Sequence, residues 1–285
     1  MRLFFLTLLF VAAPAWAWDD GTTPFVVSPD VVVERMLYLA QPKAGERLVD
    51  LGSGDGRIVI EAAKRFGANG LGVDIDPRLV ELARTNAKRA GVEKLTRFEI
   101  QDLFETDLRG VNVVTMYLLP DVNLKLLPRL VEQLKPGARI VSHDYDLGPS
   151  WPFDEMIELA LAEKMVGPLG RSRVFLWVVP ADARGRWQSN LPDLGGRWQF
   201  EIKQNHQILD VDARVGQSTG SGNMVVRGAR LRGEEIRLAI TGLVGGKGYN
   251  TLFSGKVADG RIEGNIRVSD GENHKTIPWK ATRQP

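Results

Sequence analysis

The stretch VDLGSGDGR at residues 49–57 decides the fold. It completes a short apolar run at residues 47–51, passes through three glycines in five positions, and leads into an amphipathic segment at residues 57–66. This order predicts a strand, a sharp turn and a helix, because glycine lets the backbone turn tightly and approach a ligand closely. In an open α/β sheet such a turn lies at the carboxyl ends of the strands, where ligands bind.

The glycine turn differs from the turn that binds dinucleotides. Its order is Gly-x-Gly-x-Gly, whereas the dinucleotide fingerprint is Gly-x-Gly-x-x-Gly. Asp50 and Asp55 are also poor neighbours for a pyrophosphate at a helix N-terminus. The loop therefore favours a ligand that carries a positive charge or hydroxyl groups, although three glycines alone are also consistent with a turn that binds nothing.

Apolar runs and helical patterns alternate along the chain up to residue 180. Two late apolar segments, at residues 156–161 and 174–179, predict an antiparallel hairpin at the edge of the sheet. We therefore expect an α/β fold with a Rossmann-like seven-stranded sheet, mostly parallel, and helices on both faces. The other expected strands are residues 47–51, 70–73, 96–100, 111–116 and 139–142, and the expected helices are residues 57–66, 77–90 and 121–134.

Two more carboxylates follow the ends of consecutive predicted strands. Asp74 ends the second strand, where it can accept two hydrogen bonds from vicinal ribose hydroxyls. The alternative is that Asp74 caps the helix that begins at Pro77, a role that Asp76 can also fill. Asp102 ends the third strand, where it can accept a hydrogen bond from an exocyclic adenine amine while Leu103 lies against the ring.

At these motifs the chain resembles the class I S-adenosylmethionine-dependent methyltransferases. The motifs are residues 49–57, GVDID at 72–76, QDL at 101–103 and LKPG at 134–137. The resemblance implies S-adenosyl-L-methionine as cofactor, with its amino group near Asp50, its ribose near Asp74 and its adenine near Asp102. The cofactor-binding residues that it implies are Asp50, Gly52, Ser53, Gly54, Asp55, Gly56, Asp74, Asp102 and Leu103.

A closer resemblance is to a branch of lysine methyltransferases whose mitochondrial members modify the ATP synthase c subunit and the adenine nucleotide translocase. It rests on PFVVSP at residues 24–29, VTMYLLP at 114–120, VSH at 141–143 and WPFD at 151–154, the last with one residue rearranged. The resemblance implies protein-lysine N-methylation by in-line transfer to a desolvated amine. The expected partner is a protein substrate, including membrane or envelope proteins.

Three residues at the ends of the fourth and fifth strands are candidate catalytic residues: Tyr117, Thr115 and His143. Methyl transfer is an in-line displacement that needs alignment and exclusion of water, so no nucleophilic triad is required. Tyr117 can orient an amine or merely pack under a helix, and His143 can accept a proton or form structural hydrogen bonds. No metal site is expected, because the chain has no Cys and only three widely spaced His.

The C-terminal part predicts a separate β unit. After a linker at residues 181–195, short alternating runs at residues 196–285 indicate seven or eight strands in an antiparallel β-barrel or sandwich. Trp198 and Arg283 resemble the tryptophan and arginine that close lipocalin-like barrels. Such a barrel can bind an apolar ligand or a protein, or only stabilise the chain.

The N-terminus predicts targeting to the membrane. Arg2, an apolar run at residues 3–13 and the sequence AWA at 15–17 have the anatomy of a signal peptide at residues 1–17, or of an uncleaved anchor. The chain is therefore expected to be exported (periplasmic or secreted) if the signal is cleaved, and membrane-anchored otherwise, with a methyltransferase domain at residues 22–180. A net charge of +2, from 37 basic and 35 acidic residues, gives no field for binding nucleic acid.

Export conflicts with the cytoplasmic supply of S-adenosylmethionine. Three explanations are open. The N-terminal segment does not export the domain, or the donor is supplied across the membrane, or the domain has kept its pocket and lost catalytic turnover. Two alternatives to a protein-lysine methyltransferase therefore stay open, namely an exported non-catalytic binding module that retains a nucleoside pocket and a small-molecule methyltransferase.

Overall fold

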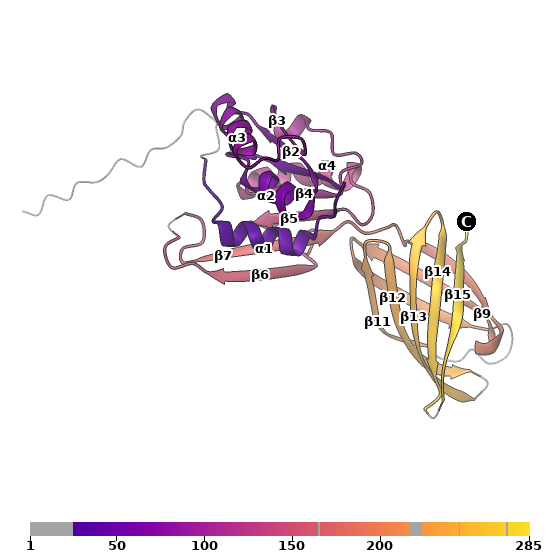
Figure 1. The fold of residues 1–285 in the computed structure, drawn as a ribbon. Helices are drawn as coiled ribbons and strands as arrows, with labels where there is room; N and C mark the ends of the chain where they lie inside the picture. Colours follow the sequence, from indigo (N-terminus) through magenta and orange to yellow (C-terminus); the bar gives the residue numbers. More distant parts are fainter. Residues whose placement is uncertain (1–24, 165, 217–223, 245, 272) are drawn as a thin grey trace, which may run out of the picture.

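The computed structural model describes residues 25–164, 166–216, 224–244, 246–271 and 273–285. The predicted signal peptide at residues 1–17 lies outside them. Two sheets organise the described residues (Figure 1). Of the helices in these ranges, none has the length and apolarity needed to cross a bilayer.

The first sheet has seven strands in the order β3-β2-β1-β4-β5-β7-β6. β1 to β5 are parallel, and the last two strands form an antiparallel hairpin at the edge, so the predicted α/β fold is confirmed. The strands are β1 (Arg47–Leu51), β2 (Asn69–Asp74), β3 (Thr96–Ile100), β4 (Val113–Met116), β5 (Arg139–His143), β6 (Glu155–Ala160) and β7 (Arg171–Val178).

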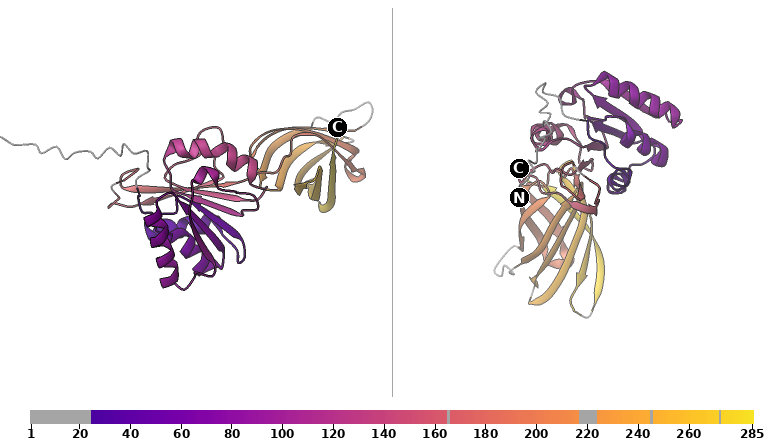
Figure 2. Two further views of the ribbon diagram at one scale, coloured as in Figure 1. Left: turned by 90° about the horizontal axis from the view of Figure 1, so that it is seen from above. Right: turned by 90° about the vertical axis from the view of Figure 1, so that its left-hand side faces the viewer.

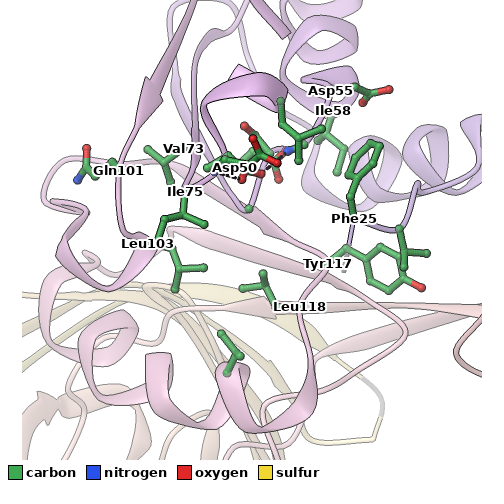
Figure 3. Close-up of a pocket in the computed structure, with 18 of the residues that line it drawn as sticks. Phe25, Asp50, Asp55, Ile58, Val73, Ile75, Gln101, Leu103, Tyr117 and Leu118 are labelled. Carbon is green, nitrogen blue, oxygen red and sulfur yellow. Dashed lines mark hydrogen bonds between the residues drawn. The ribbon is translucent and has the colours of Figure 1, made fainter. Parts of the chain in front are cut away.

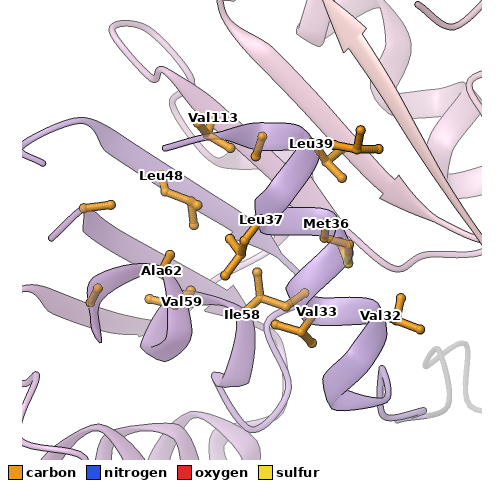
Figure 4. Close-up of a cluster of buried hydrophobic side chains, with 14 of the residues drawn as sticks. Val32, Val33, Met36, Leu37, Leu39, Leu48, Ile58, Val59, Ala62 and Val113 are labelled. Carbon is orange, nitrogen blue, oxygen red and sulfur yellow. The ribbon is translucent and has the colours of Figure 1, made fainter. Parts of the chain in front are cut away.

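Helices cover both faces of this sheet. One face packs against α1 (Asp30–Ala40), α2 (Arg57–Phe66) and α3 (Pro77–Arg89), and the other packs against α4 (Pro120–Gln133). Neighbouring residues of a strand point to opposite faces, so Leu48 joins the first cluster (Figure 4) and Val49 the second. The helix α1 is absent from the elements expected from the sequence, although its buried side chains Val33, Met36, Leu37 and Ala40 have helical spacing.

The second sheet has eight antiparallel strands in the order β10-β9-β8-β15-β14-β13-β12-β11, and it coils into a nearly closed barrel (Figure 2). Residues 185–191, which were expected to belong to a linker, form its strand β8, followed by the short helix η2 (Pro192–Leu194). The strands are β8 (Gly185–Leu191), β9 (Gly196–Asn205), β10 (Ile208–Val215), β11 (Val225–Arg232), β12 (Glu235–Val244), β13 (Lys247–Ala258), β14 (Arg261–Ser269) and β15 (His274–Arg283).

Aromatic side chains fill the inside of the barrel. Trp198, Phe200, Phe253 and Trp279 are all buried and their rings contact one another. Arg283, which the sequence resemblance pairs with Trp198, lies instead over the ring of Trp187, 4.9 Å from its centroid. Arg283 on β15 is paired in register with Trp187 on β8, whereas Trp198 on β9 is paired with Ser189 and its ring contacts Phe200 and Phe253.

The hairpin between β9 and β10 joins the barrel to the first domain. The His206 ring stacks on Trp151, with centroids 4.6 Å apart and planes 8° from parallel. Trp151 also donates its Nε1 hydrogen to Gln207 Oε1 at 3.0 Å, and Gln207 donates to the carbonyl of Pro152. These contacts fix the loop between β5 and β6 from the barrel side.

Replacing Trp279 by alanine should lower the free energy of unfolding of the barrel by about 3–5 kcal/mol, because it leaves a cavity beside Phe253 and Phe200. Urea unfolding followed by tryptophan fluorescence measures this loss. The control is Leu252→Ala on β13, where the side chain is 38% exposed and the expected change is below about 0.5 kcal/mol. Equal effects of the two substitutions would contradict a barrel core centred on Trp279.

Candidate active site

The loop after β1 is bound to the end of β2. The amides of Gly52 and Ser53 both donate to the carbonyl of Val73 at 2.9 Å, and the amide of Gly54 donates to Asp74 Oδ2 at 2.9 Å. Gly54 has φ +54°, and a Cβ there would overlap the Phe25 ring. Only glycine therefore fits this turn without displacing Phe25.

Asp74 does not cap the following helix. Asp76 is the N-cap of α3 and accepts a hydrogen bond from the Arg78 amide at 2.8 Å. Asp74 instead accepts from the Asp76 amide at 3.0 Å with one oxygen and from Gly54 with the other. Each carboxylate oxygen has two lone pairs, so Asp74 keeps acceptor capacity toward the pocket.

Asp50 is a buried acid whose pKa is strongly perturbed. It is 1% exposed, and Thr115 Oγ1 donates to its Oδ1 at 2.7 Å. Burial raises the pKa of Asp50 to about 7, and the nearby charges of Asp74 and Asp55 act in the same direction, while the Thr115 hydrogen bond opposes them. Asp50 therefore changes its charge near neutral pH.

A pocket of about 800 Å³ connects the loop ends of β1, β2, β3 and β4. Gln101 and Leu103 lie at one end and Phe25 and Tyr117 at the other, with Asp50 between them (Figure 3). The predicted site residues that line it are Asp50, Gly52, Ser53, Gly54, Asp55, Asp74, Asp102, Leu103 and Tyr117.

The other three predicted site residues do not line this pocket. Gly56 packs beneath it, where a Cβ would meet the ring of Phe98 at 2.7 Å. Thr115 is fully buried and its hydroxyl is bound to Asp50. His143 is fully buried between two serines.

Both ring nitrogens of His143 are engaged by serine hydroxyls. Lys164 Nζ donates to Ser172 Oγ at 2.7 Å, and Ser172 Oγ forms a hydrogen bond with His143 Nε2 at 2.9 Å. His143 Nδ1 forms a hydrogen bond with Ser28 Oγ at 2.9 Å. Burial lowers the pKa of the ring to about 4.

An N-terminal strap, residues 25–28, closes one side of the pocket and was not expected from the sequence. Its Phe25 ring covers Gly54, and its Ser28 is held from two sides. Arg57 forms a two-pronged ion pair with Asp55 and donates to the Ser28 carbonyl at 2.9 Å. The PFVVSP motif at residues 24–29 is the sequence signal for this strap, but its partners lie far along the chain.

Comparison with known proteins places this site among methyltransferases. The model of the ANTKMT methyltransferase domain matches residues 50–155. A protein-lysine N-methyltransferase of Saccharolobus islandicus (strain REY15A) is 39% identical over 137 residues, which are 48% of this chain and 84% of the relative. The lysine N-methyltransferase of Mus musculus that is named for the c subunit of ATP synthase is 31% identical over 215 residues, which are 73% of this chain and 83% of the relative.

Solved structures are also similar. An RNA methyltransferase of Salinibacter ruber, in complex with S-adenosyl-L-homocysteine, is 49% identical. The match covers 55% of this chain and 95% of that one, with a TM-score of 0.49.

The buried neutral His143 should make the protein sensitive to acid. Between pH 6.5 and 4 the unfolded chain binds a proton on this residue and the native chain does not, so the free energy of unfolding falls as the pH falls. The loss should reach roughly 3 kcal/mol at pH 4.

Urea unfolding at several pH values, compared with His143→Gln, measures this contribution. The control is His274→Gln, because His274 is exposed. In addition, ¹⁵N NMR should show a neutral His143 ring at pH 5. A protonated ring at that pH would contradict the assignment.

Proposed function

We propose that this chain, which belongs to the family of protein-lysine N-methyltransferases, transfers a methyl group from S-adenosylmethionine to the side-chain amine of a lysine in a protein substrate. Family membership follows from the 39% identity to a lysine methyltransferase of which the chain covers 84%. The observation that carries the proposal is one pocket into which three consecutive strand ends bring Asp50, Asp74 and Asp102.

The pocket fits the methyl donor. Its carboxylates offer acceptors for an ammonium group, for vicinal hydroxyls and for an adenine amine, in that order from Asp50 to Asp74 to Asp102. Ser53 Oγ is buried without a hydrogen-bond partner among the described residues, so it is free for a ligand. When bound, S-adenosylmethionine supplies a methyl group on a sulfonium that needs no further activation.

The acceptor end of the pocket places apolar side chains beside the Tyr117 hydroxyl. Leu118, Val122 and the Phe25 ring line it beside Tyr117. Such surroundings disfavour a charged ammonium, lower the pKa of an entering lysine amine and expose its lone pair for attack. We propose Tyr117 as the residue that contacts the amine, with Thr115 acting on Asp50 and His143 on the strap.

We further propose that the enzyme works at a membrane. The apolar run at residues 3–13 supports this, and so does the short distance from it to the pocket, because Phe25 lines the pocket. Residues 14–24, which connect the run to Phe25, can span at most about 40 Å. A retained anchor would hold the pocket that close to the bilayer, and cleavage after Ala17 would release an exported enzyme; a membrane or envelope protein is the substrate in both cases.

Donor binding should weaken as the pH falls through 7. An ionised Asp50 attracts the donor's ammonium group and a protonated one does not, so the apparent affinity should drop about tenfold between pH 8 and pH 6. Calorimetric titration of S-adenosylmethionine measures this change. Thr115→Val should move the profile to higher pH because it removes a hydrogen bond to the carboxylate, and Asp74→Ala should abolish binding.

The control for this titration is Asp107→Asn, an exposed carboxylate outside the pocket. It should leave the affinity and its pH profile unchanged. A wild-type affinity that does not vary between pH 8 and pH 6 would contradict the role given to Asp50.

Transfer of a labelled methyl group tests the reaction itself. The full chain is incubated with methyl-labelled S-adenosylmethionine and with membrane or soluble protein fractions of the source cells. Label should enter a membrane protein and be recovered as methyl-lysine after acid hydrolysis, and a chain without residues 1–17 should label the same protein more slowly. Label only in small molecules, or no transfer to any fraction, would overturn the proposal.

A further inference from the structure

We propose that Asp144 is a positioning residue for the acceptor amine. Asp144 accepts a hydrogen bond from the Tyr117 hydroxyl. The Tyr117 oxygen is thereby left as a hydrogen-bond acceptor for the incoming lysine. This inference rests on the proposed function, because it assigns a residue that prepares the lysine for methyl transfer.

Asp144 lies directly behind the acceptor end of the pocket. It follows β5 with φ +63°, an uncommon conformation for a residue other than glycine, and it is 1% exposed. Tyr117 Oη donates to its Oδ2 at 3.1 Å, and the Arg173 amide donates to its Oδ1 at 3.1 Å. Gly167 covers this pair, since a Cβ there would lie 2.9 Å from Asp144 Oδ2 and 3.5 Å from Tyr117 Oη.

Lys164 is the charged partner of Asp144. Its ammonium group forms an ion pair with Asp144 Oδ2, and both side chains are buried or nearly so. The remaining two ammonium hydrogens go to the Arg171 carbonyl at 3.0 Å and to Ser172 Oγ at 2.7 Å. Every Lys164 donor therefore has an acceptor, and the positive charge compensates the buried carboxylate.

The direction of the Tyr117 hydrogen bond follows from this charge. An ionised carboxylate has no hydrogen to give, so Tyr117 must donate to Asp144. Burial and the Asp144 charge also raise the pKa of Tyr117 above its ordinary value, so the phenol keeps its proton and does not act as the base. Toward the pocket, the Tyr117 oxygen can therefore act only as a hydrogen-bond acceptor.

This polarity matters for a reacting amine. A neutral lysine amine has two N–H donors and one lone pair, and an N–H that binds Tyr117 Oη leaves the lone pair free. The lone pair forms the N–C bond while the C–S bond breaks and its electrons stay on sulfur; the ammonium product then loses a proton to water. A Tyr117 that donated into the pocket would bind the lone pair and oppose the attack.

Kinetics of two variants and their combination test this role. Asp144→Asn and Tyr117→Phe should each lower kcat for the protein labelled in the transfer experiment by about 100-fold, with little change in the KM for S-adenosylmethionine. The double variant should be within about twofold of Tyr117→Phe, because Asp144 acts through Tyr117. The matched control is Asp146→Asn, an exposed carboxylate two residues along the same loop.

Tyrosine NMR gives a readout that needs no substrate. In chains labelled with ¹³C at tyrosine Cζ, the chemical shift of the Tyr117 signal at neutral pH should differ between Asp144→Asn and wild type, because the hydrogen bond from its hydroxyl to a carboxylate is lost. Should Asp144→Asn fail to fold with Lys164 unpaired, Asp144→Asn combined with Lys164→Met replaces the ion pair by neutral groups and should show the same shift.

The outcomes separate this inference from the proposed function. If wild type labels no protein, the lysine methyltransferase proposal fails, and NMR still decides whether Asp144 controls Tyr117. An unmoved Tyr117 signal in Asp144→Asn overturns the inference. So does a 100-fold loss from Asp144→Asn that persists in the Tyr117→Phe background, because Asp144 would then act independently of Tyr117.

Discussion

A hydrogen bond of 2.9 Å joins the amide of Gly54 to the carboxylate of Asp74 and links the first two strand ends of the sheet. It fixes the path of the glycine loop, and that path leaves space for the Phe25 ring on one side and for a ligand on the other. The same bond orients Asp74 toward the pocket. If this link were lost, the loop, the strap and Asp74 would no longer be held in one arrangement.

Local patterns predict the parts of the molecule that local chemistry controls. The alternation of apolar runs and helical patterns predicts the seven-stranded sheet. Glycine spacing and the polar residues at strand ends predict twelve site residues, of which nine line one pocket. These features follow from backbone geometry within a few residues. The helix α1 and the strand β8 were missed because β-branched and polar residues obscure their periodicity, and packing against the sheets decides them instead.

Partners distant in sequence could not be predicted. Whether His143 accepts a proton depends on Ser28 and Ser172, and Arg283 lies over Trp187, nearly a hundred residues away. The His143–Asp144 dipeptide directs attention to the histidine, yet the structure gives the aspartate the contact with Tyr117. A single sequence shows which groups are present, whereas the fold determines which hydrogen bonds they share.

The strap has a consequence for the order of folding. Ser28 meets His143 across 115 residues, and Ser172 completes the other side of that imidazole. Closing so long a loop is entropically costly, and such contacts form late. A chain emerging from the ribosome therefore cannot complete the contacts of Ser28 and Ser172 with His143 until residue 172 is available. The strap at residues 25–28, although it is made first, is therefore among the last parts of the first domain to reach its final contacts.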